Sequence, residues 1–227
     1  MSVIFKTERL SLKIGSLQLK LDVIQNIDEL FNELVSRPDD DPEVKDERIP
    51  YWAELWPSAV VLSEYLVSNG SLLKGKAVLE VGCGLGLSGI VAGMLGGNVV
   101  MTDYQNAALD FAAANWRLNN DTPVKTEILD WRSPGKTEKV DLILASDVAY
   151  ESKVFRFLIS TFKKLLRPTG TILLTEPNRK FAKDLISQLL KAGFTVQSET
   201  IHKQFQGVKH VVHLHRIQFA VSQLSVG

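Results

Sequence analysis

Residues 76–89 read KAVLEVGCGLGLSG, a short apolar strand that runs into closely spaced glycines before a helical pattern begins. Glycine lets the backbone turn sharply and approach a bound molecule without a side-chain clash. In an open sheet of parallel strands, the first strand–helix turn lies beside the crevice where cofactors bind. The segment therefore predicts a cofactor site at the end of the first parallel strand.

The chain after this loop alternates short apolar runs with helical stretches. This alternation is typical of a doubly wound α/β fold, in which helices cover both faces of a mostly parallel sheet. We expect strands at 76–81, 98–103, 124–129, 140–146 and 170–175, and helices near 87–96, 106–119, 152–166 and 179–192. Residues 194–202 and 209–220 follow each other without a helix, so they predict an antiparallel hairpin at the edge of the sheet.

The first 50 residues follow a different pattern. Residues 3–24 alternate apolar and polar side chains around Gly15, which predicts a β-hairpin, and residues 27–36 have helical spacing. An acidic loop follows Pro38, and a helix is expected at 57–69. We therefore divide the chain into an N-terminal extension (1–50) and a main domain (51–227).

Composition excludes several classes of protein. The 227 residues include 26 basic and 26 acidic residues and one cysteine, so neither a disulfide framework nor a cysteine-based metal site is expected. The balanced charge gives no support for a nucleic-acid-binding face. The chain has no apolar run long enough for a membrane span and no signal-peptide pattern at its start. We expect a cytoplasmic, monomeric protein that binds neither membranes nor nucleic acids.

The glycine loop fits two cofactors. Gly84, Gly86 and Gly89 match the dinucleotide fingerprint, whereas the glycines at 82, 84 and 86, preceded by Glu80, match an S-adenosylmethionine loop. Asp103 ends the next strand, where a carboxylate can accept hydrogen bonds from both hydroxyls of a ribose. Glu80 would repel a pyrophosphate but suits the ammonium of an amino acid. The second cofactor is therefore favoured.

Four motifs make the chain resemble a known family. They are LWP at 55–57, EVGCGLG at 80–86, LDW at 129–131 and ASDVAY at 145–150. In this order they resemble the seven-β-strand methyltransferases, which have a Rossmann-like sheet, and more narrowly methyltransferase family 16. The resemblance covers roughly residues 45–220. It implies transfer of a methyl group from S-adenosyl-L-methionine to a nitrogen acceptor, for which a protein lysine is the leading candidate.

The resemblance also implies roles for individual residues. Asp147 and Tyr150 would shape the acceptor entrance as catalytic residues, and Ser146 would contact the cofactor beside the transfer site. Asp130 and Trp131 would border the adenine. The remaining cofactor contacts would come from Trp56, Glu80, Gly82, Cys83, Gly84 and Asp103.

Alternatives remain open at this stage. They are a small-molecule N-methyltransferase, an NAD-binding oxidoreductase and a non-catalytic scaffold of the same fold. The four histidines, at 202, 210, 213 and 215, all fall in the closing hairpin. We interpret them as a solvated or partly packed face, because no carboxylate or cysteine lies at ligand spacing, and we expect no metal site.

Overall fold

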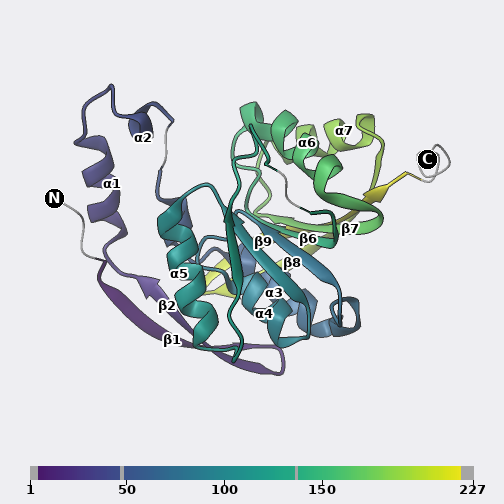
Figure 1. The fold of residues 1–227 in the computed structure, drawn as a ribbon, viewed down its shortest axis with the longest axis horizontal. Helices are drawn as coiled ribbons and strands as arrows, with labels where there is room; N and C mark the ends of the chain where they lie inside the picture. Colours follow the sequence, from purple (N-terminus) through teal and green to yellow (C-terminus); the bar gives the residue numbers. More distant parts are fainter. Residues whose placement is uncertain (1–4, 47–48, 136–137, 221–227) are drawn as a thin grey trace.

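A seven-stranded sheet forms the centre of the molecule (Figure 1). The computed structural model describes residues 5–46, 49–135 and 138–220. The strand order is β5-β4-β3-β6-β7-β9-β8, and only the pairs that involve β9 are antiparallel. The strands are β3 (Ala77–Val81), β4 (Asn98–Asp103), β5 (Lys125–Ile128), β6 (Val140–Ser146), β7 (Leu166–Glu176), β8 (Phe194–Phe205) and β9 (Val208–Phe219). The predicted doubly wound sheet with an antiparallel C-terminal hairpin is confirmed.

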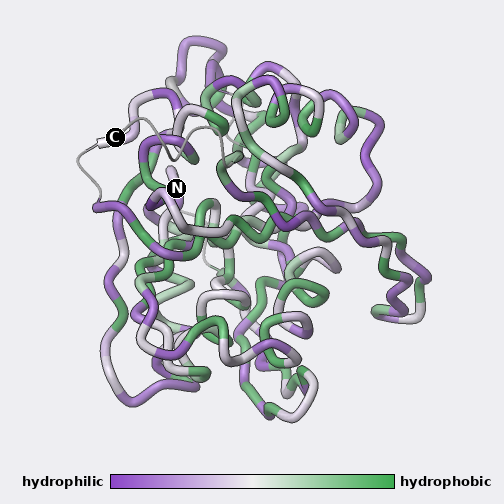
Figure 2. The backbone as a smooth tube through the Cα atoms, turned by 90° about the vertical axis from the view of Figure 1, so that its right-hand side faces the viewer, coloured by the Kyte–Doolittle hydropathy of each residue, from purple (hydrophilic) through white to green (hydrophobic). Residues whose placement is uncertain are grey.

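Helices cover both faces of this sheet because its strands are apolar on both sides. Along β6, Leu142 and Leu144 face a core shared with three helices, α3 (Pro57–Ser68), α4 (Leu87–Met94) and α5 (Asn106–Arg117). Ile143 and Ala145 face the other core, against α6 (Phe155–Leu165) and α7 (Ala182–Lys191). In Figure 2, hydrophobic stretches run through the interior, and the upper outer loops are mostly hydrophilic.

Several element boundaries differ from the predictions by a few residues, and two of these differences shape the site. β7 begins at Leu166 rather than near 170, because Val140 pairs with Leu166 before a register shift brings Leu142 opposite Thr171. The last helix, α7, begins at Ala182 rather than at 179. Residues 177–181 instead form a loop after β7, and this loop reaches the candidate site.

The N-terminal hairpin consists of β1 (Thr7–Ile14) and β2 (Leu17–Ile24), paired in antiparallel register. Leu19 and Leu21 on β2 are buried in the core beside α3 and α5. Two short helices follow, α1 (Ile27–Val35) and α2 (Pro42–Lys45). The expected acidic loop therefore includes one helical turn, and Figure 1 shows α1 and α2 beside the body of the molecule.

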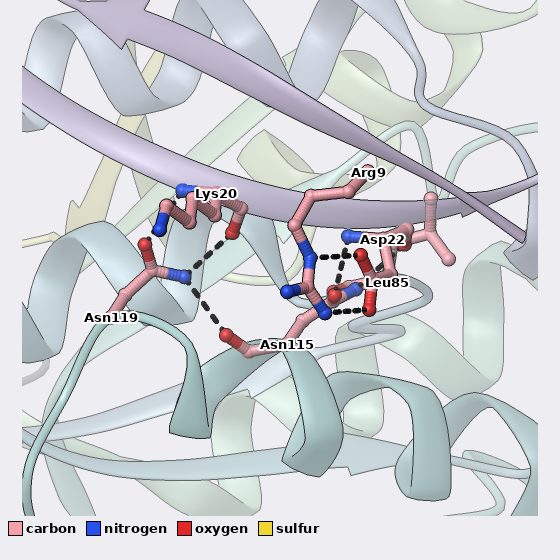
Figure 3. A network of polar contacts seen from close by, with 6 residues as sticks. All are labelled: Arg9, Lys20, Asp22, Leu85, Asn115 and Asn119. Atoms are coloured by element: carbon pink, nitrogen blue, oxygen red, sulfur yellow. Dashed lines mark hydrogen bonds and ion pairs between the residues drawn. The ribbon is translucent and has the colours of Figure 1, made fainter.

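Two asparagines of α5 and its C-terminal end bind the backbone of β2 (Figure 3). Asn115 accepts the Asp22 N–H at 2.7 Å and donates to the Asp22 carbonyl at 3.1 Å. Asn119 repeats the pattern with the N–H and carbonyl of Lys20, at 2.8 and 2.7 Å. These bonds satisfy backbone groups along one edge of the hairpin and fix its register on the domain.

Within the three described ranges, no helix combines the length and the apolar character needed to cross a membrane.

Candidate functional site

The candidate site is a cavity at the carboxyl ends of β3, β4 and β6, where open α/β sheets bind ligands. Residues of the segment before α3 close it from the opposite side. Nine of the predicted site residues line this cavity: Trp56, Gly82, Cys83, Gly84, Asp103, Trp131, Ser146, Asp147 and Tyr150. Positions spread over almost one hundred residues of sequence therefore meet in one place.

The backbone of the glycine loop between β3 and α4 adopts conformations that disfavour residues with side chains. Gly82, Gly84 and Gly86 have φ values of 66°, 50° and 84°, in the left-handed region that favours glycine. A Cβ on Gly84 would stand 3.1 Å from the backbone oxygen of Trp52. The loop is therefore fixed between the sheet and the short helix η1 (Tyr51–Ala53).

Asp103 lies at the end of β4 with only 5% of its surface exposed. Its Oδ2 accepts the Gly84 N–H at 3.2 Å, and its Oδ1 accepts the Gln105 N–H at 3.1 Å. Burial raises the pKa of this carboxyl to about 6, although the backbone donors oppose the rise. The carboxylate is thus oriented toward the cavity by the same loop that surrounds it.

Glu80 does not lie among the residues that line the cavity. Its Oε2 accepts the N–H of Gly89 in the first turn of α4 at 3.1 Å, and the side chain is fully buried between β3 and that helix. Burial raises its pKa to about 8. A Cβ on Gly89 would stand 2.5 Å from this oxygen, so glycine there makes room for Glu80. This placement does not support the predicted direct contact between Glu80 and the ammonium group of the cofactor.

Asp130 lines a neighbouring hollow rather than the main cavity. The hollow shares Tyr104, Trp131, Tyr150 and Glu151 with the main cavity, so the two adjoin. The Asp130 carboxylate accepts hydrogen bonds from Arg132, with the shortest at 2.7 Å. Trp131 stands between the two spaces.

Aromatic rings form one wall of the cavity. The indole of Trp56 donates to the Tyr51 carbonyl at 2.8 Å, and the rings of Tyr51 and Tyr150 lie 5.6 Å apart. Burial raises the pKa of Tyr150, so its phenol stays protonated. Cys83 is also buried, and burial raises the pKa of its thiol, which agrees with the interpretation that it is a spacer rather than a nucleophile.

Asp147 follows β6 and is held by an arginine that the sequence did not single out. Arg179 donates to its Oδ1 from Nε at 3.0 Å and from Nη2 at 2.8 Å. The other oxygen, Oδ2, is buried and has no hydrogen-bond partner among the described residues. Burial raises the pKa of Asp147, and the Arg179 charge opposes the rise. Glu54 also lines this side, and partial burial together with Asp147 raises its pKa.

Arg179 and Glu54 could not be found from the motifs. Glu54 sits inside the stretch IPYWAELWP next to the LWP motif, but nothing marks it as facing the cavity. The predicted helix at 179–192 places Arg179 at its first position. The register of β7 and the later start of α7 bring it over Asp147 instead.

Comparison with known proteins identifies the family. A family model described as lysine methyltransferase matches residues 46–192. The chain belongs to this lysine methyltransferase family. It is an S-adenosylmethionine-dependent methyltransferase.

Several relatives are similar over much of the chain. A protein N-lysine methyltransferase METTL21A from Xenopus tropicalis is 33% identical over 171 residues, which cover 73% of this chain and 77% of the relative. A histone-arginine methyltransferase METTL23 from Rattus norvegicus is 34% identical over 142 residues, covering 57% and 63%. The two relatives act on different amino acids, so family membership leaves the acceptor open.

Solved structures support the fold. Magnesium protoporphyrin IX methyltransferase from Synechocystis PCC 6803, with bound S-adenosylmethionine, superposes with a TM-score of 0.57 at 17% identity. The match covers 86% of this chain and 92% of that one. At this identity the likeness concerns the arrangement of strands and helices.

The residues of this lysine methyltransferase family member fit an S-adenosylmethionine molecule. The glycine loop lacks the side chains that would fill the space above β3, and the Asp103 carboxylate offers acceptors to a ribose. Tyr104 and Trp131 line both the cavity and its neighbouring hollow. In the part of the chain that the structure describes, no group of three or more metal-ligating side chains occurs.

Proposed function

We propose that the protein methylates the side-chain nitrogen of lysine in a protein substrate. One observation carries this choice: Asp147 lies in the lining of a cavity walled by aromatic rings, and one oxygen of its buried carboxylate has no hydrogen-bond partner among the described residues. An unpaired buried carboxylate oxygen is costly, and a donor on a cationic or amine ligand would satisfy it. The lysine and arginine methyltransferases among its relatives support a protein nitrogen as acceptor.

The proposed cofactor contacts follow the cavity lining. Gly82, Cys83 and Gly84 would pack against the methionine part, and Asp103 would accept hydrogen bonds from the ribose. The adenine would lie beside Trp131, with Asp130 in the adjoining hollow. Trp56 would line the cofactor from the N-terminal side, and Ser146 would contact it beside the transfer site.

The chemistry asks little acid–base work of the protein. When bound, the cofactor supplies a methyl group on a positively charged sulfur that is already a good leaving group. Lysine must lose a proton first, which costs about 4.6 kcal/mol at pH 7 from its reference pKa. Exclusion of water by Tyr51, Trp56 and Tyr150 would lower that cost, because desolvation disfavours the ammonium. Asp147 would orient the nitrogen for in-line attack.

The test uses tritiated S-adenosylmethionine and a cell lysate, followed by identification of the labelled amino acid. We expect label in methyl-lysine. Asp147→Asn should lower the initial rate at least about tenfold because alignment is lost, while the affinity for S-adenosylhomocysteine in calorimetry stays unchanged. Asp141→Asn is the matched control. Asp141 lies at the start of β6, the strand that Asp147 follows, and it pairs with Arg167 away from the cavity.

Other outcomes would contradict the proposal in distinct ways. Label in methyl-arginine would move the acceptor to a guanidinium, and label confined to small molecules would indicate a metabolite methyltransferase. Equal loss of rate in Asp141→Asn would show that the effect of Asp147→Asn is not specific to the cavity.

A further inference from the structure

The loop that carries Arg179 is held by side chains of the strands behind it. Glu176, at the end of β7, is fully buried, and its Oε2 accepts the backbone N–H of Arg179 at 2.7 Å. Asn178 lies between them with φ 52°, in the left-handed region that residues with side chains rarely adopt. Such a conformation persists only where its surroundings hold it in place.

Two histidines of β9 lie against this region, His213 at the loop itself and His215 at the end of β7. His213 lies with Nε2 3.1 Å from the Asn178 Oδ1, and its Nδ1 lies 3.0 Å from the Thr200 hydroxyl of β8. Since an amide oxygen only accepts, the Nε2 of His213 donates this bond. Its other ring nitrogen is oriented by the threonine.

His215 lies two residues further along β9 and makes a similar contact to a hydroxyl of β8. Its Nδ1 lies 2.7 Å from the Ser198 hydroxyl, and its Nε2 lies 3.7 Å from the Glu176 Oε1. The distance is too long for a hydrogen bond, so both of these facing atoms are buried without a hydrogen-bond partner among the described residues. His215 is only 5% exposed, whereas His210 and His213 are half-buried and His202 is exposed, so the histidine face is partly packed and His215 is its buried member. The buried carboxylate of Glu176 gives this ring a polar neighbour.

We propose that His213 and His215 are positioning residues for methyl transfer. His213 binds Asn178, and His215 packs against Glu176. Asn178 and Glu176 in turn fix the conformation of the loop, and the loop places the Arg179 guanidinium on Asp147. The consequence for catalysis rests on the proposed acceptor role of Asp147. The hairpin that closes the sheet thereby becomes part of the acceptor side of the site, although it does not line the cavity.

The direct test observes Arg179 itself and needs no acceptor. In protein labelled with ¹⁵N-arginine, the Arg179 Nε–H signal is assigned by its loss in Arg179→Lys, and its exchange with water is measured. We expect His213→Leu and His215→Leu to speed that exchange by about tenfold, because the loop opens more often. His213→Gln and His215→Gln keep a donor near the Nε2 position, and they should restore most of the protection.

His202→Leu is the matched control, since His202 lies on the same hairpin but is exposed on β8, opposite Val211. It should leave the Arg179 signal unchanged. His213 is only half-buried, so its leucine variant tests the proposal even if His215→Leu does not fold. Unchanged exchange in both leucine variants, or equal acceleration in His202→Leu, would overturn the positioning role.

A second experiment measures the rate of tritiated methyl transfer to lysate proteins. The leucine variants should lower the rate about tenfold with unchanged affinity for S-adenosylhomocysteine, since cofactor contacts are intact. A full rate with a mobile Arg179 would also overturn the proposal. If wild-type protein labels no lysine, the proposed function fails, whereas the exchange measurement still decides whether the histidines hold Arg179.

Discussion

Asn115 joins the N-terminal hairpin to the glycine loop by donating a hydrogen bond to the carbonyl oxygen of Leu85 at 3.1 Å. The same side chain accepts a hydrogen bond from the Asp22 N–H of β2 and donates one to the Asp22 carbonyl (Figure 3). The side chain is fully buried on α5; its bond to Leu85 is buried, and its two bonds to Asp22 are partly buried. The hairpin and the cofactor loop are therefore coupled through one amide.

Replacing this amide should weaken both stability and cofactor binding. Asn115→Ala leaves the buried carbonyl of Leu85 and the partly buried backbone groups of Asp22 unpaired, and we expect a loss of about 2–4 kcal/mol in the free energy of unfolding. The affinity for S-adenosylhomocysteine should also fall, because the loop loses an anchor. Denaturant unfolding and calorimetry measure the two effects.

Asn119→Ala is the control for this change. Asn119 makes the same pair of backbone bonds to β2, at Lys20, but none of its bonds reaches the glycine loop. It should lower stability by about 1 kcal/mol and leave the affinity for the cofactor product unchanged. Equal affinity losses in both variants would show that the hairpin, rather than the Leu85 bond, supports the loop.

Gly84→Ala should abolish most cofactor binding. The new Cβ would press on the Trp52 carbonyl at 3.1 Å and would also strain a left-handed backbone. We expect at least about a tenfold loss of affinity, together with destabilisation of about 1–2 kcal/mol. Gly75→Ala separates the two effects, since Gly75 has φ 71° but nothing within 4 Å of a Cβ. If it weakens binding as much, the close approach of Trp52 is not the cause.

Asp103 should make cofactor binding depend on pH. Its pKa is raised to about 6, and only the ionised carboxylate offers acceptors to both ribose hydroxyls. The affinity for S-adenosylhomocysteine should therefore fall as the pH is lowered through about 6, approaching tenfold per unit below it. Calorimetry between pH 5 and about 7.5 checks this, and Asp103→Asn should bind weakly with a flat profile. A pH-independent wild type would contradict the assignment.

Glu80→Gln should remove a pH dependence of stability. The folded-state pKa of Glu80 is about 8, above the ordinary value of 4.5, so the folded protein binds more protons in this window. Stability therefore falls as the pH rises from 4.5 to 8, with a contribution of up to about 1.4 kcal/mol per unit. Glutamine keeps an acceptor for the Gly89 N–H and carries no charge. Unfolding free energies of the two proteins should diverge with rising pH; parallel curves would exclude Glu80 as the source.

Much of the site follows from sequence position because a parallel sheet brings the carboxyl ends of its strands together. Gly82, Asp103 and Ser146 each end or follow a predicted strand, and all three line one cavity. Glu80 and Asp130 are different. Each belongs to a motif, but the direction of the Glu80 side chain depends on packing under α4, and that of Asp130 on the ion pair with Arg132.

The sequence by itself determined the order of strands and helices, the antiparallel closing hairpin and the glycine loop with its acidic partner. Apolar periodicity and glycine spacing are local properties, so they can be recognised in the chain alone. Only the tertiary structure decided that Arg179 reaches Asp147, that His215 is buried against Glu176, and that Asn115 ties β2 to Leu85. These contacts join residues 30 to 93 positions apart, and side-chain direction across such separations is set by register and packing rather than by local pattern.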